Sequence, residues 1–100
     1  MRLEFHPEAE VELIEAAAHY ELQVPGLGER FHAEMQRATE VLLEHPEIGS
    51  PADPHLRKFV LNRFPFTLYY SATPDALRIE VVAHQSRRPG YWRSRFDRQL

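Results

Sequence analysis

The sequence contains no cysteine, and it has one tryptophan and one lysine. The absence of cysteine excludes a disulfide scaffold, a thiolate metal site, a thiol nucleophile and an iron–sulfur cluster. No apolar run approaches the roughly 18 residues that a membrane span requires. The first residues lead straight into an acidic stretch and show no signal-peptide pattern. We therefore expect a cytoplasmic protein without a membrane anchor.

Short catalytic and nucleotide-binding motifs are also missing. The chain has no G-x-S-x-G, P-loop or dinucleotide fingerprint. Its six histidines form no pair spaced by four residues, as a helical metal site would need. The glutamates of the first predicted helix are typical of a solvated face. We expect neither a metal ion nor a cofactor.

Length and composition favour one globular domain over residues 1–100. The chain is 43% hydrophobic and 27% charged, which argues against disorder. Its charges are unevenly divided. Residues 1–50 carry three arginines against eleven glutamates, whereas residues 51–100 carry nine basic side chains against four acidic ones. This division predicts an acidic or polyanionic partner for the second half, or acidic helices that match a basic sheet within one fold.

The first half predicts a short strand followed by two helices. Residues 2–5 alternate polar and apolar side chains, and Pro7 suits the first turn of a helix that continues to Gln23. The apolar residues of this helix recur at helical spacing: Ala9, Leu13, Ala17 and Tyr20, joined by Ile14 and Ala18. A break at 24–26 precedes a second helix from about Leu27 to His45. Its apolar stripe is Leu27, Phe31, Met35, Ala38 and Leu42. The short break predicts an αα-hairpin.

The second half predicts strands. Prolines mark a loop over about 46–55, and a turn is expected at 73–76. The β-prone runs are 59–61, 66–70 and 77–83, and the tail over 89–100 is long enough for a short helix. The predicted fold is an α+β two-layer domain of order β-α-α-β-β-β. In it the N-terminal strand and the helical hairpin pack on an antiparallel sheet.

Functional side chains concentrate in residues 57–70 and 84–95. The second stretch follows an apolar strand directly and holds four arginines, a tyrosine and the tryptophan. Arginine offers fork-shaped donors to phosphate or carboxylate, and neighbouring aromatic rings can stack on bases or anchor a peptide. The candidate binding residues are Arg57, Arg63, Arg87, Arg88, Tyr91, Trp92 and Arg95. Alternatively, the aromatic rings fold back on the sheet and the arginines pair with the acidic helices.

Four segments together resemble the RelE/ParE superfamily, toxins of bacterial type II toxin–antitoxin modules. They are FHPEAE at 5–10, PGLGERF at 25–31, RFPFTLYY at 63–70 and HQSRRPGYW at 84–92. The resemblance runs along nearly the whole chain in the family's order. It implies the same helices-on-sheet architecture and a cognate antitoxin that wraps the toxin in a hetero-oligomer. It also implies a role in growth arrest and plasmid stabilisation.

The superfamily divides by target. RelE-like members cleave mRNA on the ribosome, and ParE-like members inhibit DNA gyrase without known hydrolytic residues. RNA cleavage without a metal needs a base, a cation and an acid. For this alternative the chain offers His84 as base or acid, Arg63 and Arg87 as cations and Tyr91 as a proton donor.

The ribonuclease members look strongly basic, whereas this chain has Lys58 as its single lysine and is acidic overall. Each phosphate that a protein neutralises adds to its affinity for nucleic acid, so this composition favours the ParE-like function of gyrase inhibition. An mRNA endonuclease and a non-toxic protein-binding module remain as alternatives.

Overall fold

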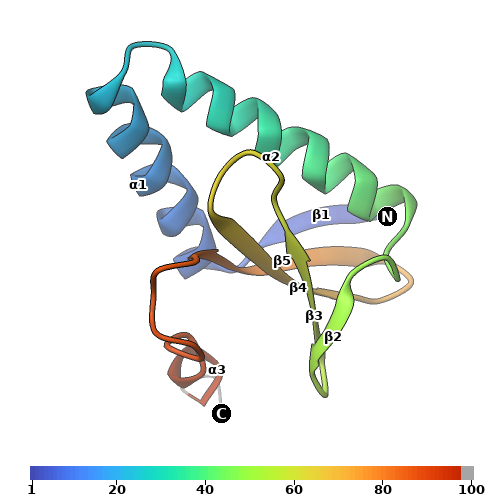
Figure 1. Ribbon diagram of the computed structural model, residues 1–100. Helices are drawn as coiled ribbons and strands as arrows, with labels where there is room; N and C mark the ends of the chain where they lie inside the picture. Colours follow the sequence, from blue (N-terminus) through green and yellow to red (C-terminus); the bar gives the residue numbers. More distant parts are fainter. Residues whose placement is uncertain (98–100) are drawn as a thin grey trace.

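The computed structural model describes residues 1–97 (Figure 1). Its elements, in chain order, are β1 (Arg2–Phe5), α1 (Pro7–Gln23), α2 (Leu27–Glu44), β2 (Ser50–Asp53), β3 (Leu56–Val60), β4 (Phe66–Ala72), β5 (Ala76–His84) and α3 (Ser94–Asp97). Within these residues no helix is both long and apolar enough to cross a membrane.

The helical hairpin confirms the prediction. His6 caps α1: its ring Nδ1 accepts a hydrogen bond of 3.1 Å from the amide of Glu8, and Pro7 occupies the first turn. Gly26, at φ 88°, adopts the left-handed conformation that a residue with a side chain rarely takes, and α2 begins after it. At Gly28 a Cβ atom would lie 2.5 Å from the carbonyl oxygen of Ala17, so glycine allows the close approach of the two helices.

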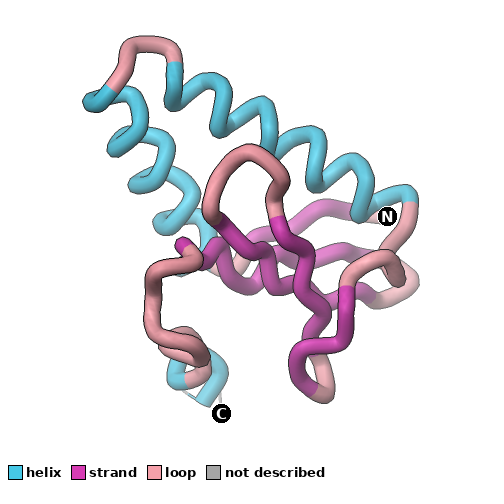
Figure 2. The backbone as a smooth tube through the Cα atoms, in the orientation of Figure 1, coloured by secondary structure: helices cyan, strands magenta, loops and turns pink. Residues whose placement is uncertain are grey.

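The sheet has five strands in the order β1-β5-β4-β3-β2. The antiparallel pairing predicted for the strands of the second half is confirmed, and β1 joins their sheet by pairing with β5 in parallel, which makes the sheet mixed. A parallel pair needs a long connection, and the whole helical hairpin and three strands lie between these two. Figure 2 shows β1 passing beneath the helices to the far edge of the sheet.

The predicted loop over 46–55 is wrong in part, because it contains β2. Pro51 lies in that strand, which proline tolerates because β2 is an edge strand and one side of its backbone has no partner. The next strand, β3, begins at Leu56 rather than at residue 59. It pairs with β2 through a register shift between Pro51 and Asp53.

The main core lies between the two helices and the sheet. Its fully buried members include Phe31 and Leu42 of α2 and Leu68, Tyr70 and Leu77 of the sheet. The expectation that Ile14 and Ala18 join the apolar stripe of α1 is wrong. Ile14 is 60% exposed and Ala18 is also exposed. The inward face of α1 is formed by Ala9, Leu13, Ala16, Ala17 and Tyr20.

A second apolar cluster covers the other face of the sheet. It consists of Leu56, Val81, Ala83 and Trp92, with Tyr69, Tyr91 and Phe96 packed against it. We call residues 85–97 the C-terminal segment. Figure 1 shows this segment on the side of the sheet opposite the hairpin, with α3 at its end. The tail that the sequence predicts as a short helix thus forms α3 within its described part, and residues 98–100 lie outside the described residues.

Candidate functional site: the C-terminal segment

A β-bulge on β5 decides which side chains meet the C-terminal segment. On β4, Tyr69 pairs with Val81 and Tyr70 pairs with Ile79, so Glu80 has no partner across the sheet. The extra residue reverses the alternation of side chains along the strand. Ile79 therefore belongs to the main core, while Val81 lies in the cluster beneath the C-terminal segment.

Trp92 fixes the C-terminal segment on the sheet. Successive turns lead from β5 to α3, and Gly90 in one of them has φ 76°. The Trp92 side chain is buried at 4% exposure. Its ring centroid lies 4.7 Å from that of Tyr69 and 5.8 Å from that of Phe96. Burial of an aromatic ring of this size contributes strongly to stability, so this tryptophan closes the second face of the sheet.

Glu12 of α1 holds the same segment from the helical side. Both guanidinium nitrogens Nη1 and Nη2 of Arg95 donate to the Glu12 carboxylate, at 3.1 and 2.9 Å. The Tyr91 hydroxyl and the backbone amide of Val82 also donate to it, the latter at 3.0 Å. The two ionic side chains are only 7% and 16% exposed, so this is a nearly buried, bidentate ion pair.

The network shifts the ionisation of both donors. Burial alone lowers the pKa of Arg95, but the hydrogen bond and the charge of Glu12 outweigh it, and the pKa is raised. Burial raises the pKa of Tyr91 well above its ordinary value, and the hydrogen bond to Glu12 raises it further. The Tyr91 hydroxyl therefore keeps its proton near neutral pH, and that proton is already engaged.

Three of the residues expected for RNA cleavage line one small cavity. His84, Arg87 and Tyr91 surround a space of about 160 Å³, which is below the roughly 300–1,000 Å³ usual for small-molecule sites. The Nδ1 atom of His84 accepts a hydrogen bond of 3.0 Å from the amide of Ser86. The guanidinium carbon of Arg87 lies 3.8 Å from the centre of the Tyr91 ring. A cation stacked on an aromatic face is held in place while it stays open to solvent.

Arg88 and Trp92 line the same cavity, whereas Arg63 and Arg57 lie elsewhere. Arg63 lines a separate cavity together with Arg30 and Arg37, next to α2. Arg57 donates to the carbonyl oxygens of Glu47 and Gly49, at 3.2 and 2.7 Å, and thereby braces the chain before β2.

Exposure divides the candidate binding residues into two groups. Arg63, Arg87 and Arg88 are exposed, whereas Trp92 and Arg95 are buried. Trp92, Arg95 and the half-buried Tyr91 therefore follow the alternative that the sequence left open, in which these side chains pack within the fold. The rings fold back on the sheet, and Arg95 pairs with the acidic helix.

Glu12 is a site residue that the sequence did not single out, because the sequence pattern places it among the solvated glutamates. The position of Glu12 on α1 is the signal that could have identified it. Glu12 adjoins Ala9 and Leu13, the inward residues, and so lies at the boundary of the buried face. A group of carboxylates on the second face of the sheet was not foreseen either. Within residues 1–97 no cluster of three or more histidine, aspartate or glutamate side chains is arranged to hold a metal ion.

The fold and the C-terminal segment define the chain as a small α+β protein in which a helical hairpin and a C-terminal segment cover a mixed five-stranded sheet. One similar solved structure is described as the chromosomal ParDE toxin–antitoxin system from P. aeruginosa. The TM-score is 0.72 at 18% identity, over 84% of this chain and 95% of that one. Another is the isolated E. coli RelE toxin, with a TM-score of 0.64 at 19% identity, over 99% of this chain and 98% of that one.

A family model confirms the resemblance seen in the sequence. Residues 3–89 match the family described as the ParE toxin of the type II toxin–antitoxin system, parDE, and the chain belongs to this family. A comparison with curated proteins finds no match.

Proposed function

We propose that this chain is a toxin that arrests growth by binding and inhibiting DNA gyrase, and that a cognate antitoxin neutralises it. The observation that carries the proposal is the engagement of the Tyr91 hydroxyl by Glu12. Because burial and the hydrogen bond to Glu12 raise the pKa of Tyr91, and because its proton is hydrogen-bonded to that carboxylate, Tyr91 is poorly placed to donate the proton to a leaving oxygen. Arg63, a second expected catalytic residue, lines a different cavity.

Inhibition by contact needs exposed donors rather than proton transfer, and the chain has them. Arg87 and Arg88 are exposed on the C-terminal segment, close to the end of a rigid strand. Within residues 1–97 the Arg88 side chain makes no hydrogen bond or ion pair, so its guanidinium is available. A loop that a buried tryptophan and a buried ion pair hold in place is a suitable platform for such a contact.

The first test is induction of the chain alone. Growth should stop, and co-expression of a small protein encoded beside it should restore growth. Cells that filament and mount a DNA-damage response before translation falls would support gyrase as the target. Normal growth at high soluble expression would contradict the toxin function and favour a non-toxic binding module.

Paired variants separate contact from catalysis. Arg87→Glu with Arg88→Glu should abolish growth arrest, because it reverses the charge presented to the target. His84→Gln with Tyr91→Phe should leave growth arrest in place, since contact needs no proton transfer. The matched control is Arg2→Glu with Arg30→Glu, a double reversal at exposed positions of the first half. It should leave growth arrest unchanged. Thermal unfolding of each purified variant verifies that the fold persists.

A ribosome-dependent mRNA endonuclease is the second candidate. One observation favours it: His84, Arg87 and Tyr91 line the same cavity. In that case mRNA from cells expressing the chain should be cleaved, and the His84/Tyr91 double variant should lose both cleavage and growth arrest. Loss of one general acid or base costs roughly 10²–10⁴ in rate. That result would overturn gyrase inhibition by contact.

A further inference from the structure

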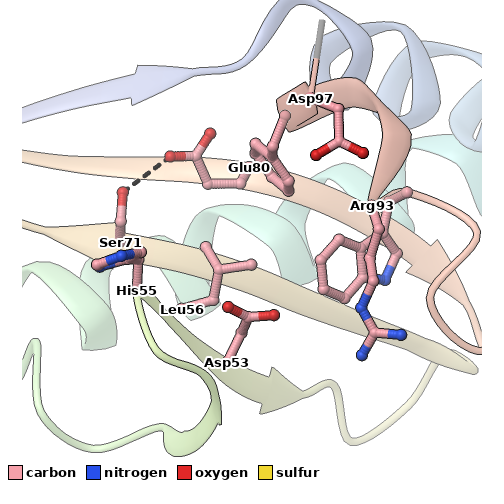
Figure 3. Close-up of a pocket in the computed structure, with 9 residues that line it drawn as sticks. Asp53, His55, Leu56, Ser71, Glu80, Arg93 and Asp97 are labelled. Atoms are coloured by element: carbon pink, nitrogen blue, oxygen red, sulfur yellow. Dashed lines mark hydrogen bonds between the residues drawn. The ribbon is translucent and has the colours of Figure 1, made fainter. Parts of the chain in front are cut away.

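A second cavity lies on the side of the sheet that the C-terminal segment covers. It occupies about 380 Å³ between the β2–β3 connection, the strands β4 and β5, and α3. Leu56, Trp92 and Phe96 supply apolar walls, while Asp53 and Asp97 stand at opposite sides of it (Figure 3). It is larger than the space beside His84 and reaches the size of ordinary ligand sites.

The charge of this cavity is opposite to that of its surroundings. Residues 51–100 contain only four carboxylates, at Asp53, Asp75, Glu80 and Asp97, among nine basic side chains. Three of the four line this cavity. Among residues 1–97, Arg93 is the only arginine or lysine that lines it, and the guanidinium carbon of Arg93 lies 5.5 Å from the centre of the Trp92 ring. The acidic residues of the basic half are therefore gathered at one place.

Two of these carboxylates are available to a ligand. Glu80 is already satisfied: it accepts from the Ser71 hydroxyl at 2.8 Å and from Nε of Arg78 at 3.1 Å. Among the described residues, the side-chain carboxylates of Asp53 and Asp97 make no hydrogen bond or ion pair, and Figure 3 shows a bond only between Ser71 and Glu80. Within the described part of the chain, the cavity thus has one carboxylate that is held by hydrogen bonds and two carboxylates without a partner, around an apolar floor.

We propose that this cavity binds an arginine side chain of a partner protein. A guanidinium is planar and weakly hydrated, so it tolerates contact with leucine and aromatic walls better than an ammonium does. Its five donors form a planar fork that suits a site with more than one carboxylate, whereas the three donors of a lysine point from one atom. An anion is repelled by the same carboxylates. The proposal goes beyond the proposed function and does not rest on it, since it concerns a different face of the C-terminal segment.

The test uses the full chain and three short peptides. Acetyl-Gly-Arg-Gly-amide is the probe, the lysine peptide tests the shape of the cation, and the citrulline peptide has the same shape without charge. Trp92 is the only tryptophan and lines the cavity, so its fluorescence and its indole N–H resonance report binding there. The arginine peptide should bind saturably. The citrulline peptide should bind roughly 10-fold to 100-fold more weakly, as expected for the loss of charge-assisted hydrogen bonds.

Two single variants locate the site. Asp53→Asn and Asp97→Asn should each weaken binding of the arginine peptide, while Asp75→Asn, the one carboxylate of the second half outside the cavity, should leave it unchanged. Asp97 is exposed, so its substitution leaves the fold intact even if Asp53→Asn does not. Equal binding of the arginine and citrulline peptides would overturn the proposal. A response of the Trp92 indole to the polyamine spermidine but not to the arginine peptide would also overturn it. An equal loss of binding in Asp75→Asn and Asp97→Asn would do the same.

Discussion

A single glutamate joins the first helix to the last part of the chain. Glu12 accepts from Arg95, from the Tyr91 hydroxyl and from the backbone amide of Val82. That amide lies on β5 beyond the last residue that pairs with β1. The Glu12 carboxylate therefore accepts the hydrogen bond from the Val82 amide that a neighbouring strand would otherwise accept. It also neutralises the buried guanidinium of Arg95.

Removing this charge tests its importance. We expect Glu12→Gln to lower the free energy of unfolding by about 3–5 kcal/mol, because buried Arg95 loses its bidentate counter-ion and keeps only the carboxylate of Glu8, 3.6 Å from its Nε. Urea unfolding of the purified variant measures the change. Glu15→Gln, an exposed position one turn further along α1, is the control and should alter stability by less than about 0.5 kcal/mol. Similar losses for both variants would show that Glu12 acts only through general helix charge.

His6 makes stability depend on pH in the mildly acidic range. Burial lowers its pKa below 6.5, and Arg78 and Arg95 lower it further, against the opposing charges of Glu80 and Glu8. The unfolded chain therefore binds more protons than the folded one between the two pKa values. The free energy of unfolding should accordingly fall as the pH drops below about 6.5.

The variant His6→Asn isolates this contribution. Asparagine is a good N-cap and does not titrate, so it should keep the start of α1 while it flattens the pH dependence between pH 7 and 5. Thermal unfolding at several pH values measures the difference. An identical slope for both proteins would assign the pH dependence to the carboxylates instead.

The apolar face of α2 should dominate stability at the level of elements. Leu42 is fully buried in the main core. Its truncation in Leu42→Ala should cost about 2–5 kcal/mol, from lost burial and the cavity left behind. The matched control is Val41→Ala, a neighbouring residue on the same helix that is 37% exposed. A melting temperature that is unchanged by Leu42→Ala would contradict the packing of α2 on the sheet.

Helices whose apolar residues recur at regular spacing could be predicted from the sequence. Strands whose position depends on pairing with distant strands could not. The stripe of α2 and the break at 24–26 follow from spacing and from the conformational freedom of Gly26, and both are confirmed. The strand β2 could not be predicted, because Pro51 fits a strand only at a sheet edge, at the start of the strand or at a bulge, and these depend on how the strands pair. The parallel pairing of β1 likewise depends on residues more than 70 positions away in the chain.

The candidate site was predictable as a segment but not as a set of contacts. The composition of residues 84–95 identified where arginine and aromatic side chains gather. Which of them are free depends on the bulge at Glu80 and on Glu12, and both are tertiary features. The bulge breaks the strict alternation that a sequence pattern assumes. The sequence therefore offered the packing of the aromatic rings on the sheet only as an alternative, and it did not indicate the cavity at Asp53.

At the scale of the whole molecule, the uneven charge is only partly matched within the fold. The ion pairs of Arg95 with Glu8 and Glu12 join the acidic half to the basic half. Arg87 and Arg88 are exposed on the C-terminal segment. An internal match and an outward positive surface therefore coexist, which is consistent with a segment that is packed on one side and presents charge on the other.

Removal of the C-terminal segment should leave a protein that is folded but prone to self-association. A chain that ends at His84 keeps the main core, so its helical circular dichroism should persist. It exposes Leu56, Val81 and Ala83, which that segment buries, and it leaves Glu12 without Arg95. We expect this chain to bind a hydrophobic dye and to associate on size-exclusion chromatography. Trp92→Ala in the full chain should lower stability by about 3–5 kcal/mol, because it empties the same face without removing the ion pair. A truncated chain that stays monomeric and binds no dye would show that the sheet does not need its second layer.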